Sequence, residues 1–254
     1  MFDNIVITGA NNIYYESLLT LISSIHKYAI NQVDKVLVYD FGLDPTEIEH
    51  LKKLKLVEII TINEVFPVCE KITSTKIKSY FWKMYAFQNS KKFGKNILWL
   101  DAGCCLIDNI SSIYEKLIND QIFVVGDYFH PNYNFTHNLC RTIMNVSEKE
   151  INDCQISAGI FGFVSDGKYS ELINKSWDYT LIDGCIDGFH ENHRHDQSIL
   201  SILISRYDCP RQDIDIYGYW TDINRDLKSA RNKGAVIFVH RRSYCDKTNL
   251  LYEN

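Results

Sequence analysis

The fold class of this chain is decided by the stretch Asn96-Ile97-Leu98-Trp99-Leu100-Asp101-Ala102-Gly103. Its four consecutive apolar residues, 97–100, predict a strand that is buried on both faces, as strands of parallel sheets are. Asp101 follows directly and places a carboxylate at the end of this strand. Open α/β sheets bind their ligands at the carboxyl ends of their strands. An aspartate here can also simply cap a turn, so the rest of the sequence has to decide between the two roles.

On both sides of this stretch, short apolar runs alternate with segments whose apolar residues recur at helical spacing. The expected strands are 4–8, 35–39, 57–60, 96–100, 122–125, 156–164 and 236–239. The expected helices are 14–28, 46–54, 81–90, 111–119, 169–179 and 196–205. This alternation predicts an α/β fold with a mainly parallel central sheet and helices on both of its faces. No linker or repeat interrupts the pattern, so we expect a single domain.

Composition and charge exclude several classes of function. The chain has 254 residues, with 27 Lys and Arg against 32 Asp and Glu, for a net charge of −5. No overall positive field is present to bind nucleic acid or an anionic membrane, although a local basic patch could still bind a phosphate. No run of 18 apolar residues predicts a transmembrane span.

Cysteine usage and the N-terminal residues bear on the compartment. The eight cysteines are scattered and include no C-x-x-C pair, and the first residues lack the pattern of a signal peptide. We therefore expect buried free thiols and a cytoplasmic protein. A disulfide framework or a zinc site is the alternative.

Several polar residues lie next to other predicted strands and helix starts. They are Lys83, Ser157-Ala158-Gly159, Asp196-Gln197 and His240. Together with Asp101 they offer a cation for hydroxyl groups, a backbone open to close approach, a polar pair and two metal ligands. That combination suits a phosphorylated sugar.

The predicted loop 183–195 suggests a different chemistry. It contains His190, His193 and His195 directly before Asp196, and imidazole and carboxylate groups are common zinc ligands. A metal-dependent hydrolase is therefore an alternative, although the sequence contains no second ligand cluster. The competing interpretation is a solvated loop whose histidines contact substrate.

The order and spacing of these segments, from Ile5 to His240, resemble the GT-A nucleotide-sugar glycosyltransferases, particularly the glycogenin-like retaining group. The segment IVITGANNIYYESLLTLISSI is similar to the opening of that family, which implies that Thr8 and Tyr14 hold uracil. SYFWKMYAFQNSKKFGKNILWLDAG is similar to the stretch that runs from a sugar-contacting lysine to the Asp-x-Asp motif. The matching residues are Lys83 and Asp101.

Three later segments extend this resemblance. QISAGIFGF is similar to the segment that lines the donor sugar, which implies that role for Ser157, Ala158 and Gly159. HRHDQSILSIL resembles the helix start beside the anomeric carbon and provides Asp196 and Gln197. VIFVHRR resembles the late strand that carries the histidine metal ligand, here His240.

The resemblance implies a GT-A domain with a nucleotide-binding half, 1–103, and an acceptor-side half, 104–254. The implied activity is retaining transfer of a sugar from a UDP-sugar to a hydroxyl group of a glycan, protein or lipid. The implied catalytic residues are Lys83, Asp196 and Gln197. Asp101 would contact the nucleotide and, with His240, would hold Mn²⁺ or Mg²⁺.

The sequence departs from this family at Gly103, which replaces the second aspartate of Asp-x-Asp. Four explanations stay open. Asp101 and His240 suffice for the metal, or another acid such as Asp108 substitutes. Alternatively, the site works without a metal and a basic residue neutralises the leaving diphosphate, the candidates being Arg241, Arg242 and Lys247. The fourth explanation is that the site is inactive and the protein only binds nucleotide sugars.

Four aromatic residues have an open role on the acceptor side. Phe129, Tyr133, Phe135 and Trp220 either line an acceptor groove or pack in the interior, and for each one we expect packing.

Overall fold

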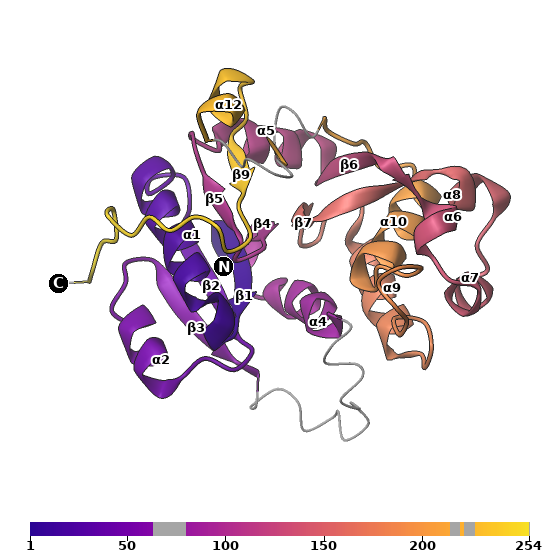
Figure 1. Ribbon diagram of the computed structural model, residues 1–254, viewed down its shortest axis with the longest axis horizontal. Coiled ribbons are helices and arrows are strands. Elements are labelled where there is room, and N and C mark those ends of the chain that lie inside the picture. The colour runs from indigo at the N-terminus through magenta and orange to yellow at the C-terminus, as the bar shows by residue number, and fades with distance from the viewer. Residues whose placement is uncertain (63–79, 214–218, 221–226, 254) are drawn as a thin grey trace.

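The computed structural model describes residues 1–62, 80–213, 219–220 and 227–253. Its main sheet has the strand order β3-β2-β1-β4-β7-β6 (Figure 1). The strands are β1 (Phe2–Ala10), β2 (Lys35–Asp40), β3 (Val57–Thr61), β4 (Gly94–Leu100), β6 (Ile122–Pro131) and β7 (Cys154–Val164). The first four pair in parallel, and β7 runs antiparallel to both of its neighbours. The predicted α/β fold with a mixed, mainly parallel sheet is thus confirmed.

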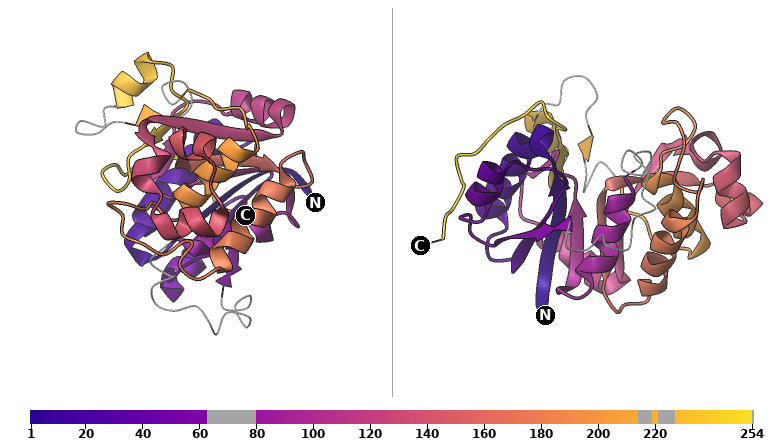
Figure 2. Two further views of the ribbon diagram at one scale, coloured as in Figure 1. Left: turned by 90° about the vertical axis from the view of Figure 1, so that its right-hand side faces the viewer. Right: turned by 90° about the horizontal axis from the view of Figure 1, so that it is seen from below.

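Helices cover both faces of this sheet. The longer ones are α1 (Tyr15–Tyr28), α4 (Phe81–Ser90), α5 (Ser111–Asp120), α9 (Ser170–Leu181) and α10 (Asp196–Arg206). The shorter ones are η1 (Asn12–Tyr14), α2 (Pro45–Leu51), α6 (Asn132–Phe135), α7 (Asn138–Met144), α8 (Glu148–Asn152) and α12 (Leu227–Asn232). Figure 2 shows α1 and α2 at one end of the molecule and α9 and α10 at the other.

Side chains alternate between the two faces of the sheet along each strand, and a hydrophobic core forms on each face. Ile5 and Ile7 pack in one core together with apolar residues of α4, α9 and α10. Val6, whose side chain points to the opposite face, packs in the other core with residues of α1 and α5. Because both faces are buried, the strands are apolar almost throughout, which is the pattern that the sequence shows at 96–100.

Helix α2 begins where its capping residues predict. The backbone N–H of Asp44 donates to Oε2 of Glu47 at 2.8 Å, and Pro45 occupies the first helical position. The helix ends at Leu51 rather than at the predicted residue 54. Beyond it, Leu54 forms a β-bridge with Tyr252 near the C-terminus, and that pairing takes up the backbone groups that a longer helix would use.

A second, three-stranded sheet has the order β5-β9-β8, formed by β5 (Cys104–Leu106), β9 (Ile237–Val239) and β8 (Tyr219–Trp220). It brings the chain after β9 against the turn after β4. The backbone N–H groups of His240 and Arg241 both donate to the carbonyl oxygen of Gly103, each at 2.8 Å. This contact determines which side chain of that segment reaches the site.

The seven cysteines among the described residues are all free thiols; Cys69 lies outside these residues. In the same part of the chain, no helix combines the length and the apolar character needed to cross a membrane.

Candidate active site

A cavity of about 1600 Å³ opens at the carboxyl ends of the parallel strands. Ala10, Asp40, Thr61 and Asp101 lie at or just after the ends of β1, β2, β3 and β4, and all four line the cavity. This is the ligand-binding edge that the topology of an open α/β sheet predicts. The volume exceeds the roughly 300–1,000 Å³ of an ordinary small-molecule pocket, so the cavity has room for two substrates.

Lys83 forms the centre of the site. It lies in the first turn of α4, and its Nζ is 3.1 Å from Oδ1 of Asp101 and 3.0 Å from Oδ2 of Asp196. The same ammonium group donates to the carbonyl oxygen of Ala158 at 3.3 Å. Asp101 also accepts a hydrogen bond from the indole Nε1 of Trp99 at 2.7 Å. The structure therefore joins three residues that the sequence analysis predicted separately.

Burial and charge oppose each other in this cluster. Burial by itself lowers the pKa of Lys83, but the carboxylates of Asp101 and Asp196 outweigh burial and raise that pKa, so the lysine is charged. Burial raises the pKa of Asp196, and Lys83 opposes the shift. Asp196 also begins α10, where the helix dipole favours negative charge.

Strand β7 forms the wall beside this cluster. Ser157, Ala158 and Gly159 all line the cavity. A Cβ atom at Gly159 would lie 2.9 Å from Oδ2 of Asp101, so only glycine fits without displacing the carboxylate. The backbone N–H of Asp101 donates to the carbonyl oxygen of Gly159 at 2.9 Å. The expected close approach to the backbone is present, and the group that approaches is Asp101.

The other predicted contacts are divided between the cavity and the core. Tyr14 and Gln197 line the cavity, and the guanidinium of Arg242 lies 5.4 Å from the centre of the Tyr14 ring. Thr8, by contrast, is completely buried. Its neighbour Gly9 lines the cavity instead.

The two metal ligands implied by the resemblance, Asp101 and His240, lie in different surroundings. His240 is completely buried, does not line the cavity, and has its ring centre 5.9 Å from that of Tyr244. Asp108 is exposed and also lies away from the cavity. Oδ1 of Asp101 is engaged by both Lys83 and Trp99, and the side chain of Asp101 is partly exposed. Within the described ranges, no three His, Cys, Asp or Glu side chains gather to hold a metal ion. One carboxylate and one imidazole make a donor set that is poorer in oxygen than the coordination that Mg²⁺ and Mn²⁺ prefer.

The main chain of Arg241 occupies the space beside Gly103 that the second aspartate of Asp-x-Asp would need. A Cβ atom at position 103 would lie 2.7 Å from Cα and 2.9 Å from the carbonyl oxygen of Arg241. Arg241 has φ 56°, in the left-handed region that non-glycine residues rarely adopt, and it lines the cavity. Of the other two basic candidates, Arg242 lies over Tyr14, and Lys247 pairs with Glu16 at 2.7 Å.

Sequence reasoning missed Arg194 and Asp127, which also line the cavity. The Arg194 guanidinium lies 4.1 Å from the centre of the Phe135 ring and 3.8 Å from Oδ2 of Asp127. Burial lowers the pKa of Arg194; Asp127 opposes this shift, and the positive charge of Arg241 adds to it. The available signal was the position of Arg194, two residues before the start of α10.

Two of the three histidines of loop 183–195, His193 and His195, lie with their ring centres 5.6 Å apart. His190 is exposed and lines the cavity, whereas His193 is completely buried with its ring centre 4.1 Å from that of His137. His195 lines the cavity as the residue before α10. The hydrolase alternative therefore finds no metal cluster among these residues.

The four aromatic residues with an open role separate into different environments. Phe129 is 87% exposed and lines the rim of the cavity, so it does not pack as expected. Tyr133 is exposed as well. Phe135 packs under the Arg194 guanidinium. The side chain of Trp220 lies outside the described part of the structure.

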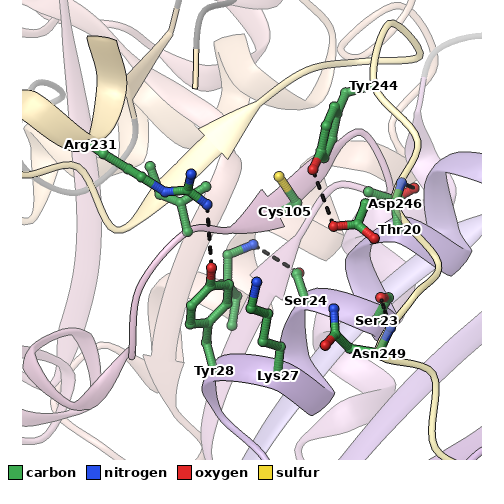
Figure 3. Close-up of a pocket in the computed structure, with 12 residues that line it drawn as sticks. Thr20, Ser23, Ser24, Lys27, Tyr28, Cys105, Arg231, Tyr244, Asp246 and Asn249 are labelled. Carbon is green, nitrogen blue, oxygen red and sulfur yellow. Dashed lines mark hydrogen bonds between the residues drawn. The ribbon is translucent and has the colours of Figure 1, made fainter. Parts of the chain in front are cut away.

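A second, much smaller crevice lies between α1, β5 and the segment after β9. Figure 3 shows Lys27 and Tyr28 of α1 with Arg231 and Tyr244 around it, and Arg231 bonded to the Tyr28 hydroxyl. Its volume is about 20 Å³, which is enough for about one water molecule. It is too small for a substrate, so the large cavity is the candidate active site.

No protein-family model and no curated protein matches this chain. Solved structures do match it. The apo structure of the bifunctional glycosyltransferase WbbM superposes with a TM-score of 0.67 at 13% identity, over 96% of this chain and 46% of that one. This chain thus spans about half the length of WbbM.

Two further structures match over most of both chains. The galactosyltransferase LgtC, in complex with donor and acceptor sugar analogs, gives a TM-score of 0.58 at 13% identity, over 93% of this chain and 85% of that one. Apo mouse xyloside xylosyltransferase 1 gives a TM-score of 0.55 at 14% identity, over 100% of this chain and 98% of that one. At these identities the likeness shows the fold: an α/β domain of the GT-A glycosyltransferase type.

Proposed function

We propose that this protein is a glycosyltransferase that moves a sugar from a UDP-sugar to a hydroxyl group of an acceptor, with retention of configuration. One observation carries the proposal: Lys83 lies within 3.1 Å of both Asp101 and Asp196 at the strand-end cavity. This cation and these two carboxylates come from α4, the end of β4 and the start of α10. They provide the donors and acceptors that hold sugar hydroxyls, and the three superposed structures are all glycosyltransferases.

The proposed roles follow the positions along the cavity. Tyr14 stacks on the base, and Asp101 contacts the ribose. Lys83 and Asp196 hold hydroxyl groups of the donor sugar, which the backbone of Ser157–Gly159 lines, and Gln197 lies beneath the anomeric carbon. Such fixed polar groups act by orienting the reactants and by stabilising charge in the transition state.

The bond changes are those of a substitution at the anomeric carbon. The bond between this carbon and the diphosphate oxygen breaks, and its electron pair leaves with UDP. A bond forms between the acceptor oxygen and the same carbon, on the face that UDP leaves. The proton of the acceptor hydroxyl passes to the leaving diphosphate.

The acceptor is proposed to enter past Phe129. Its exposed ring lies on the cavity rim, next to Tyr128 and His130, and rings exposed beside a polar cleft are typical of binding surfaces. A glycan acceptor fits this mixture of apolar faces and polar groups best.

The test is turnover of a panel of UDP-sugars, with release of UDP as the readout. We expect Asp101→Ala to reduce turnover at least about 100-fold, because Lys83 and the donor lose a shared partner. Asp108→Ala is the matched control, since Asp108 is exposed and lies outside the cavity. Thermal melting checks that both variants fold. Equal turnover in Asp101→Ala and wild type would overturn the assignment.

Binding measurements separate the alternatives. Donor binding with UDP release supports the transferase. Binding without release for any sugar or acceptor would support the non-catalytic nucleotide-sugar binder, which Gly103 keeps open. If no UDP-sugar binds, both functions are wrong.

A further inference from the structure

We infer that this site neutralises the donor diphosphate with the guanidinium groups of Arg241 and Arg194, in place of the divalent cation that the GT-A resemblance implies. The inference rests on the proposed function, because it concerns the charge of the proposed donor. It follows from the packing at Gly103, from the partners of the cavity carboxylates and from the placement of the two arginines.

The packing at Gly103 excludes a second carboxylate. A side chain at this position would begin 2.7 Å from the Cα atom of Arg241, closer than real Cβ contacts come. The carbonyl oxygen of Gly103 meanwhile accepts the N–H groups of His240 and Arg241, each at 2.8 Å. These bonds hold Arg241 at φ 56°. The contact that removes the acid therefore also brings Arg241 to the cavity.

The remaining carboxylates of the cavity are engaged by other donors. Their partners are Lys83 for Asp101 and Asp196, the backbone N–H groups of Gly42 and Leu43 for Asp40, and His130 with Arg194 for Asp127. A divalent cation would have to compete with Lys83 for Asp101, against the repulsion of a like charge 3.1 Å from that oxygen.

Arg241 and Arg194 face one cavity from different parts of the chain. They are near enough for the charge of one to disfavour the charge of the other, and two like charges in one concave site raise the local concentration of an anion. Within the described ranges, Nε of Arg194 is buried and has no hydrogen-bond partner. The planar guanidinium fork matches the oxygens of a phosphate. The pair is thus arranged to bind a diphosphate between them.

Calorimetric titration of UDP and of uridine, in EDTA and in Mn²⁺, tests the inference. In EDTA we expect UDP to bind at least about tenfold more tightly than uridine, with Mn²⁺ changing the UDP affinity less than about twofold. Arg241→Gln and Arg194→Gln should each weaken UDP about tenfold and leave uridine unchanged, as expected for a lost charged hydrogen bond. Arg231→Gln, which removes an arginine outside the cavity, is the matched control and should bind UDP normally.

Two results would overturn the inference, and they differ in what they mean for the proposed function. If UDP binds tightly only with Mn²⁺, the inference is wrong and the proposed donor stands. If UDP binds in neither buffer, the inference and the proposed donor both fail. The wild-type comparison of EDTA with Mn²⁺ gives this answer even where an arginine variant does not fold, as thermal melting would show.

Discussion

A single residue, Gly103, determines how the chain packs around the candidate site. Its missing side chain lets the segment after β9 lie directly on the turn after β4, with the Arg241 backbone in the space that a Cβ atom would fill. The neighbouring atoms are main chain and cannot rotate away as the end of a flexible side chain can. Position 103 therefore has little tolerance for any side chain.

We predict that Gly103→Ala lowers the free energy of unfolding by about 1–3 kcal/mol, the usual cost of forcing an extra group into a packed site. Urea titration measures this change. Gly126→Ala is the control, because the atoms nearest to its added Cβ belong to the ring of Tyr128, which is exposed and can move. Equal stability of Gly103→Ala and wild type would contradict the packing argument.

Residues at the ends of strands and helices were predictable from the sequence, and side-chain direction was not. Asp101 and Asp196 follow from the end of a buried strand and the start of a helix. Thr8 and His240 are buried, whereas the next residues in the chain, Gly9 and Arg241, line the cavity. Thr8 and Gly9 are successive residues of β1 and lie on opposite faces of the sheet, whereas His240 and Arg241 follow the end of β9. In both segments the register of the chain decides which residue reaches the cavity. Only long-range packing determines that register.

At the scale of elements, the C-terminal segment is held to α1 by polar contacts. The backbone N–H groups of Asn249 and Leu251 donate to Oγ of Ser23 and to Nδ1 of His26, at 3.1 and 2.9 Å. The other ring nitrogen of His26, Nε2, lies 2.7 Å from the carbonyl oxygen of Lys55. With Nδ1 as acceptor, Nε2 carries the proton, so His26 is neutral in this arrangement.

We predict that acidification loosens this segment. Burial lowers the pKa of His26 below its usual 6.5, and hydrogen bonds to the backbone oppose the shift only partly. A group with a lowered pKa in the folded state stabilises the fold fully above its unfolded pKa and loses that contribution as the pH falls. Amide exchange of residues 249–253 should therefore accelerate as the pH falls below about 6.5, beyond the intrinsic pH effect. His26→Gln should remove this additional acceleration, and its persistence would refute the mechanism.

Element length explains which elements the sequence predicted. The four parallel strands and the long helices have strong periodicity and were expected close to their observed bounds. Helices α6, α7 and α8 have 4, 7 and 5 residues, too few for a helical repeat to show. Strand β6 continues to Pro131, whereas the prediction ended at residue 125. Register shifts after Val124 break the alternation of the strand, so its second part lacks the pattern that predicts a strand.

For the molecule as a whole, the cavity extends across elements from both ends of the sequence. Tyr14 lies on η1, directly after the interior strand β1, whereas Phe129 lies on β6 at one edge of the sheet. The proposed function therefore assigns the donor and the acceptor to different parts of the chain. Loss of one binding region should leave the other intact.

We predict that Phe129→Ala raises the KM for the acceptor about tenfold and leaves the dissociation constant of UDP unchanged. The reason is that this exposed ring is proposed to contact the acceptor and not UDP. Steady-state kinetics with a varied glycan acceptor provide the first value, and calorimetry provides the second. The exposed Leu139, on α7 and outside the cavity, supplies a control in Leu139→Ala. A change in UDP binding without a change in acceptor KM would place Phe129 on the donor side.

The hydrogen bond from Trp99 to Asp101 gives the site an optical signal of its own. This indole is completely buried, its N–H points at the carboxylate, and the Lys83 ammonium lies 5.3 Å from its ring centre. Trp82, whose ring centre is 6.2 Å away, lines the cavity itself. Any ligand that redistributes charge around Asp101 changes the electric field at both chromophores, so their fluorescence reports occupancy of the cavity without an added label.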